Sequence, residues 1–250
     1  MTRMIMVGAV LMGICGVASA APAREELTAA KVVEVWPGQA PTAWQALLDI
    51  QRTVDTAGWD VVVRLKAGVH GPIAATGALV GGGQLVIQGE PGAVIDGGQL
   101  PAVSATRGAT VTVGDVELRG EAGALAATDR SRIFVGRRVT MAASGIQVKA
   151  ATNSSVVLSS PYAVTSSGAV HLQAQGHSTI SVQGPPTFWS ASYSSAVLVA
   201  TQAEILFTGG FWGQPTGRAA DIRFGALLYT AGAALPGTEA PIVVDGGIWR

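Results

Sequence analysis

Five side chains in the C-terminal third of the chain have the chemistry to bind a sugar. They are two tryptophans, one tyrosine and two arginines: Trp189, Tyr193, Trp212, Arg218 and Arg223. Flat aromatic rings stack on the faces of sugar rings, and guanidinium groups hydrogen-bond hydroxyls and carboxylates. Aromatic side chains in these turns would equally fill a wider apolar core. The pattern therefore leaves two interpretations, a ligand-binding surface or core packing.

Side chains for cleaving a glycan are scarce. Hydrolases use two or three clustered carboxylates, and lyases combine Ca²⁺-binding aspartates with an arginine or lysine base. The closest approach to such a cluster is the pair Asp115 and Glu117, expected on one strand face, with a solvated turn favoured over a catalytic pair. His70, His171 and His177 are too dispersed for a metal site, and His171 is expected to face solvent. We therefore predict no catalytic residue, metal ligand or cofactor site.

Composition argues against nucleic acid and anionic membranes as partners. The 250 residues include 33 glycines, only 13% are charged, and the formal net charge is zero. One basic cluster is expected to be a solvated edge rather than an anion site: Arg130, Arg132, Arg137 and Arg138. About half of the residues are apolar, which is enough for one long core in a single domain.

A short β pattern recurs through most of the chain and must position these side chains. Its copies are 22 to 26 residues apart and open at Gly83, Ala109, Ser131, Ser154, Ser178, Ala203 and Gly225. Each copy holds at least two alternating segments separated by Gly, Ser or Pro corners. A period of this size without a helical pattern is typical of a β-solenoid, in which each turn stacks on its neighbours.

Alternation within the copies predicts which side chains enter the core. Val111 and Val113 share one strand face, and we expect both to point inward. Their apolar neighbours should come from the turns that open at Gly83 and Ser131. Glycine and asparagine between the strands tolerate the left-handed corners that such a coil requires.

The first twenty residues are typical of an export signal. Arg3 supplies a positive charge, residues 4–17 form a short apolar core, and Ala18-Ser19-Ala20 matches a cleavage site. The apolar core is too short for a stable membrane span, and Cys15, the one cysteine, lies inside it. We expect a periplasmic or secreted protein that begins near Ala21.

A helical pattern precedes the first full turn. Trp44, Leu47, Leu48 and Val54 fall at helical spacing within residues 41–57, and Thr42 is a suitable N-cap. An amphipathic helix at this place would cap the exposed end of the solenoid. The expected organisation is a signal at 1–20, a lead-in with the helix at 21–58, and the solenoid at 59–250.

Several motifs resemble a known family. The run DIQRTVDTAGWDVVVRLKAGVHGPI (residues 49–73) is similar to the opening of pectin-lyase-like right-handed β-helices. More narrowly, it resembles the β-helical tail-associated proteins of phages and prophages, as do the stretches around PTFW (186–189), PTGR (215–218) and ALPG (234–237). Two features depart from that pattern. The acidic, Gly-rich run before the helix is reduced to WPGQ (36–39), and an export signal does not suit a virion protein.

The resemblance implies a single-stranded right-handed parallel β-helix of seven or eight turns, an all-β fold. We expect an exported, non-enzymatic scaffold or glycan-binding module related to a phage tail protein. The alternative is a polysaccharide lyase or glycoside hydrolase of the pectin-lyase superfamily. Nothing helical follows the last strand, so either Trp249 folds over the final turn or the C-terminal end forms a homo-oligomer.

Overall fold

The computed structural model describes residues 24–39, 42–184, 186–188, 192–208, 216–231, 239–243 and 245–250. The expected export signal at 1–20 lies outside these residues. Within the described part of the chain, no helix is long and apolar enough to cross a membrane.

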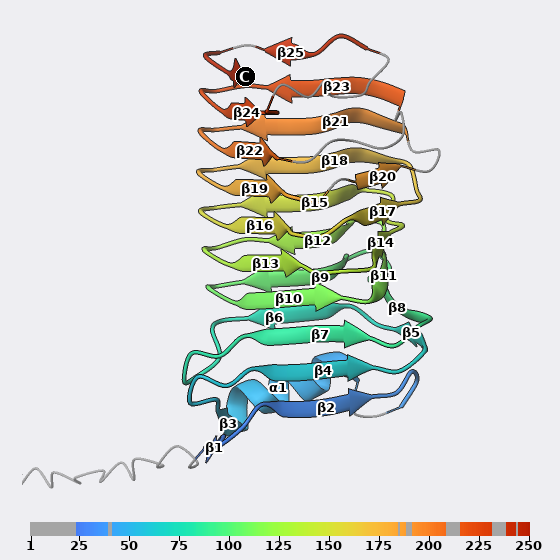
Figure 1. Cartoon of the computed structure of the whole chain (residues 1–250), viewed down its shortest axis with the longest axis vertical. Coiled ribbons are helices and arrows are strands. Elements are labelled where there is room, and N and C mark those ends of the chain that lie inside the picture. The colour runs from blue at the N-terminus through green and yellow to red at the C-terminus, as the bar shows by residue number, and fades with distance from the viewer. Residues whose placement is uncertain are drawn as a thin grey trace, which may run out of the picture.

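Three parallel sheets run along a β-solenoid of about seven turns, as Figure 1 shows. Sheet 1 has ten strands: β2 (Lys31–Val35), β4 (Val61–Leu65), β7 (Leu85–Gly89), β10 (Thr110–Gly114), β13 (Arg132–Val135), β16 (Ser155–Leu158), β19 (Thr179–Val182), β22 (Glu204–Phe207), β24 (Leu227–Tyr229) and β26 (Ile248–Trp249). Sheet 2 has six strands: β5 (Gly68–His70), β8 (Ala93–Asp96), β11 (Val116–Arg119), β14 (Val139–Met141), β17 (Tyr162–Val164) and β20 (Pro186–Phe188). Sheet 3 has eight strands: β6 (Ile73–Thr76), β9 (Pro101–Thr106), β12 (Gly123–Ala127), β15 (Ile146–Ala151), β18 (Gly168–Gln175), β21 (Ser192–Ala200), β23 (Thr216–Ile222) and β25 (Ile242–Val243). The predicted parallel β-helix is confirmed.

Apolar side chains stack in ladders along the solenoid axis. Val111 pairs in register with Leu85 and Ile133, and all three point into the core. Val113 is fully buried between its register partners Ile87 and Val135. The predicted strand phase is therefore confirmed.

Two-residue left-handed corners join sheet 3 to sheet 1. Their positive φ values recur at 107–108, 129–130, 152–153, 176–177, 201–202, 224–225 and 245–246. The second N–H of each corner donates to the first carbonyl of the next corner, at 2.9 to 3.2 Å. Each corner thereby satisfies the backbone of its neighbour, so corners with non-glycine residues keep this conformation.

A serine ladder lies inside these corners. The Ser131 amide donates to Ser154 Oγ at 3.1 Å, and the Ser154 amide donates to Ser178 Oγ at 3.1 Å. All three serines are buried, and Ala109 and Ala203 take the equivalent places in neighbouring turns. Side-chain hydroxyls therefore serve backbone amides that the sheet ladders leave unpaired.

Replacing Ser154 with alanine should lower the free energy of unfolding by about 1–3 kcal/mol, because the Ser131 amide would be left buried without an acceptor. Urea unfolding measures this change. The matched control is Ser155→Ala, which removes an outward hydroxyl from the next position in the chain. Equal losses in the two variants would show that the ladder contributes nothing specific.

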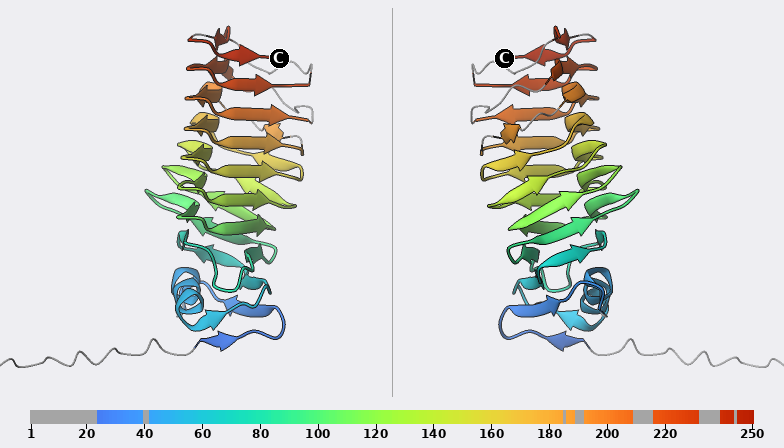
Figure 2. Two further views of the ribbon diagram at one scale, coloured as in Figure 1. Left: turned by 90° about the vertical axis from the view of Figure 1, so that its left-hand side faces the viewer. Right: turned by 90° about the vertical axis from the view of Figure 1, so that its right-hand side faces the viewer.

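Helix α1 (Ala43–Thr53) lies at the N-terminal end, beside the first turns (Figure 2). Thr42 and Gln45 form a capping box at its start, which confirms the predicted N-cap. Leu47 and Ile50 are buried toward the core. Trp44 differs from the expectation of an inward helix face, because its side chain is 46% exposed.

The lead-in is already part of the solenoid. β2 pairs with β4 in register over five residues, so it forms the first strand of sheet 1. β1 (Glu25–Glu26) pairs with β3 (Val54–Asp55), the segment directly after α1. At the other end Trp249 packs against the core and donates through Nε1 to Thr230 Oγ1 at 3.5 Å. Trp249 thus covers part of the last turn.

Candidate functional site

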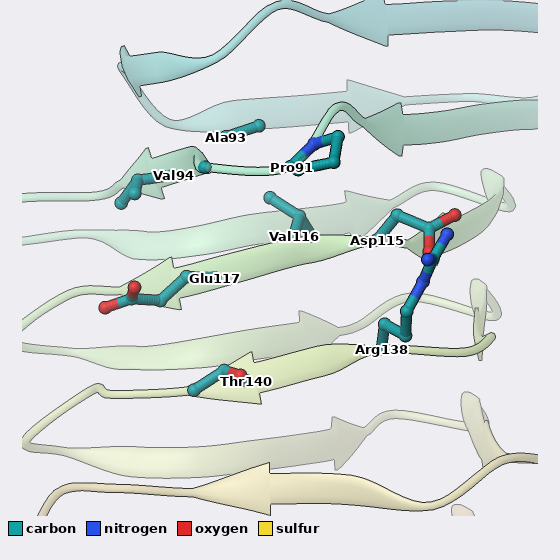
Figure 3. Close-up of a pocket in the computed structure, with 9 residues that line it drawn as sticks. Pro91, Ala93, Val94, Asp115, Val116, Glu117, Arg138 and Thr140 are labelled. Atoms are coloured by element: carbon teal, nitrogen blue, oxygen red, sulfur yellow. The ribbon is translucent and has the colours of Figure 1, made fainter.

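A groove of about 250 Å³ lies over the outer face of sheet 2 (Figure 3). Three consecutive turns contribute to it through strands β8, β11 and β14 and the corners before them. The groove is lined by Pro91, Gly92, Ala93, Val94, Asp115, Val116, Glu117, Arg138 and Thr140.

Parallel register places three residues of the groove in one row: the buried Val94, and Glu117 and Thr140, which are half-buried. Glu117 pairs with Val94 on one side and with Thr140 on the other. Because strand neighbours lie about 4.8 Å apart, an apolar group, a carboxylate and a hydroxyl follow one another along the axis. Figure 3 shows Glu117 and Thr140 on neighbouring strands of this face.

Asp115 and Arg138 close one edge of the groove. Asp115 occupies the corner between β10 and β11 with a φ of 57°, and its side chain is only 9% exposed. Its carboxylate accepts a hydrogen bond from Arg138 Nε, and Gln88 Nε2 donates at 3.3 Å. Arg137 Nε lies 3.6 Å from the same carboxylate. Figure 3 shows Asp115 and Arg138 pointing toward each other.

The pKa of the Asp115 carboxyl lies below its ordinary value. Burial alone would raise it, but hydrogen bonds from Arg138 and Gln88 and the charges of Arg138 and Arg137 together outweigh the burial. Asp115 is therefore ionised at neutral pH and cannot supply a proton to a leaving group. Its role in this geometry is to hold the Arg138 guanidinium at the groove edge.

Glu117 is also held by an arginine. Arg119 Nε donates to Glu117 Oε1 at 2.6 Å within the same strand, and this hydrogen bond raises the pKa of Arg119. The two carboxylates of the groove are thus both engaged with guanidinium groups. The arrangement presents hydrogen-bond donors, a carboxylate acceptor and the Thr140 hydroxyl side by side.

A second groove, of about 520 Å³, lies between α1 and the corners that lead into sheet 3. Trp44 and Leu100 are its largest exposed side chains, and Thr42 and Ser104 add hydroxyls. Ala93 and Val94, at the beginning of β8, line the first groove. Leu100 and Pro101, shortly after the end of β8, line the second groove. The two grooves therefore flank one strand of sheet 2.

The predicted sugar-binding residues are only partly described. Trp189 and Trp212 lie outside the described residues, and Tyr193 lies on β21. Arg218, on the neighbouring strand β23, forms an ion pair with Glu239 at 3.6 Å. Arg223 follows the other end of β23 and binds Asp221 through two hydrogen bonds of 2.6 and 2.7 Å. The structure thus places Tyr193 and Arg218 on adjacent strands and separates Arg223 from them.

His171 is buried, so the expected solvent-facing position was wrong. A hydrogen bond of 2.8 Å joins its Nε2 to the Tyr162 hydroxyl, and the two rings stack. His70 is buried beside the Lys66 carbonyl, whereas His177 lies in an exposed corner as expected. Among the described residues, no group of three potential ligands is placed to hold a metal ion.

The Asp115–Arg138 pair was missed, because Asp115 was expected in a solvated turn and Arg138 on a solvated edge. The available signal was their separation of one repeat period, which brings both side chains to the same corner in adjacent turns. Comparison of the chain with protein-family models, curated proteins and solved structures finds no match. The relation to pectin-lyase-like proteins therefore stays a prediction from the motifs.

Proposed function

We propose that this protein is an exported, non-enzymatic scaffold that binds a glycan in the groove over sheet 2. The observation that supports this most is the Arg138 guanidinium, held by Asp115 beside Glu117 and Thr140. A polyhydroxyl chain needs such neighbouring donors and acceptors on a rigid surface. The stacked turns supply that rigidity.

The charges at the groove edge favour an acidic glycan. Arg137 and Arg138 together hold two positive charges against the single carboxylate of Asp115. Both guanidinium groups are about two-thirds exposed, and each has five N–H donors, so donors remain for a ligand. A sugar carboxylate would take the place of water on these donors.

The same geometry favours binding over cleavage. A hydrolase needs one carboxyl with a raised pKa to donate a proton, whereas the pKa of Asp115 is lowered. Arg119 Nε donates to Glu117 Oε1 at 2.6 Å, so this side chain is already engaged with a guanidinium group. The alternative of a lyase or glycoside hydrolase therefore stays an outcome of the test.

The Trp44 groove extends the proposed binding surface across β8. An indole ring with flanking hydroxyls suits the apolar face of a sugar ring, and Trp44 is half-exposed there. A chain lying along β8 would meet Arg138 at one end and Trp44 at the other. The C-terminal set of Trp189, Tyr193, Trp212, Arg218 and Arg223 is a second proposed surface for the same class of ligand.

Export and ancestry belong to the same proposal. The N-terminal pattern of Arg3, an apolar core and Ala18-Ser19-Ala20 supports a periplasmic or secreted location. The motifs shared with phage tail-associated β-helices support descent from such a protein. A glycan-binding solenoid outside the cytoplasm is consistent with both.

A glycan-array screen of the purified protein, run beside an assay for new reducing ends and unsaturated products, tests the proposal. We expect binding to one or more acidic oligosaccharides and no product. Turnover of a bound glycan would instead establish the lyase or hydrolase alternative. An array without any bound glycan would overturn the proposed function.

Replacing Arg138 with alanine should weaken binding of the best array ligand about 10-fold or more, because a charge-assisted hydrogen bond is lost. Calorimetric titration measures the dissociation constant. The matched control is Lys149→Ala, which removes one positive charge from the outer face of sheet 3. Equal effects of the two substitutions on the dissociation constant would show that only the overall charge matters, and would rule out the groove as the binding site.

A further inference from the structure

We propose that the outer face of sheet 1 binds a second copy of this chain, with the two solenoid axes parallel. One outward side chain per strand forms a continuous row through the sheet register. Along the axis, the row contains Val32, Val62, Val86, Thr112, Phe134, Val157, Ser181, Leu206 and Tyr229. We call it the sheet 1 row, and its side chains are exposed or half-buried.

The sheet 1 row differs from the equivalent rows of the other sheets. From β9 to β18, the sheet 3 row is small or polar: Ser104, Ala126, Lys149 and Gln173. The sheet 2 row passes from Val94 through Glu117 and Thr140, where the proposed glycan groove lies. Seven of the nine side chains of the sheet 1 row are therefore large and apolar, with Thr112 and Ser181 between them, and a mostly apolar surface of this length marks an interaction site.

The size of the face fits a stable dimer. Strands about 4.8 Å apart give the ten-stranded sheet a length of roughly 45 Å, and four residues along each strand give a width of roughly 13 Å. The projected face is then about 600 Å², and accessible side-chain area exceeds its projection. This approaches the roughly 800 Å² per partner of a standard interface.

Charge complementarity selects the parallel arrangement. A twofold axis parallel to the solenoid places each residue of the sheet 1 row opposite its own copy. The position two residues before the row then faces the position two residues after it, at the same height. On β4 this sets Asp60 opposite Arg64 of the second copy, and on β13 it sets Arg132 opposite Gly136.

An antiparallel arrangement conflicts with these charges. Full overlap of the nine-residue sheet 1 row would centre on Phe134 of β13. The position two residues before the row would then face the same position of the second copy, so Arg132 would lie opposite Arg132 of the second copy. Like charges directly opposed across an interface are unfavourable. The parallel pair avoids this and leaves the outer face of sheet 2 free in both copies.

Sedimentation of the purified full chain tests the dimer. We expect twice the monomer mass at micromolar concentrations. The double variant Val86→Lys, Val157→Lys should raise the dissociation constant of the dimer at least ~10-fold, because it places charges within the interface. The matched control, Ser104→Lys, Ala126→Lys, adds the same charges to the sheet 3 row and should stay dimeric. Circular dichroism shows that all variants fold.

Other results would overturn the proposal. A wild-type protein that sediments as a monomer rules out the dimer. A dimer that survives Val86→Lys, Val157→Lys but dissociates with Trp249→Ala associates instead through its C-terminal end. Both results leave glycan binding untouched, because that proposal rests on sheet 2.

A single cysteine distinguishes the two arrangements. The one natural cysteine, Cys15, lies in the expected export signal, so in the mature chain beginning near Ala21 Val62→Cys supplies a single thiol, on the sheet 1 row. In the parallel pair this position faces its own copy, and a short thiol cross-linker should join two chains. In the antiparallel pair it faces Leu206 of the second copy, and no cross-link forms. Ser104→Cys on sheet 3 is the control for random collisions.

Discussion

Replacing Val113 with aspartate should unfold the central turns of the solenoid. Val113 is fully buried and is stacked between Ile87 and Val135. An unpaired carboxylate at this place costs on the order of several kcal/mol, a large part of a typical domain's stability. Thermal unfolding followed by circular dichroism measures the loss.

The control for Val113→Asp is Ala126→Asp, which adds the same group to an outward position in the same turn. We expect that variant to melt close to the wild-type protein. If Val113→Asp also melted close to the wild-type temperature, Val113 would point outward and the assignment of inward and outward residues in the central turns would be reversed.

Acid should destabilise the protein through His171. Complete burial lowers the pKa of His171 to about 3, from an ordinary value near 6.5. Between these two values the unfolded chain binds a proton that the folded protein does not, so stability falls as the pH falls. The free energy of unfolding should lose about 1.4 kcal/mol per pH unit below 6.5, on the order of 4–5 kcal/mol by pH 3.

The variant His171→Gln isolates this effect, because glutamine keeps a hydrogen-bonding group and does not titrate. At neutral pH the variant is expected to be less stable than the wild-type protein, since it lacks the ring that stacks on Tyr162. Urea unfolding from pH 7 to pH 4 should show the difference narrowing. His177→Gln, which replaces a histidine in an exposed corner, is the matched control. A difference for His171→Gln that stays constant with pH would contradict the buried, uncharged histidine.

Period and alternation were sufficient to predict the solenoid. A coil of stacked strands requires an inward apolar residue at every second position, and this requirement is visible at Val111 and Val113. The start of α1 was equally visible, because Thr42 and Gln45 stand at the spacing of a capping box. These features depend on neighbours in the sequence or on a regular period.

Alternation failed where two successive residues point inward. In the middle of β18, His171 and Leu172 are both buried, as Gln147 and Val148 are on β15. A strict period of two places one member of each pair in solvent. The polar member then needs a partner inside the solenoid, and Tyr162 provides it for His171. Nothing in the local pattern marks this position.

The groove itself depends on contacts between turns. Asp115 and Arg138 are polar corner residues in separate copies of the repeat, and each alone is typical of a solvated surface. Stacking brings them together and buries the carboxylate. Trp44 was misplaced for a related reason, because α1 packs through Ala43, Ala46, Leu47 and Ile50 and leaves the indole beside Leu100. Packing between distant segments decides both.

A crystal structure of the protein with its best acidic oligosaccharide would test the central claim most directly. We predict a sugar carboxylate on the Arg138 guanidinium, hydroxyl groups on Glu117 and Thr140, and an intact glycan. A ligand bound elsewhere on the solenoid, with the groove over sheet 2 occupied only by water, would contradict the account.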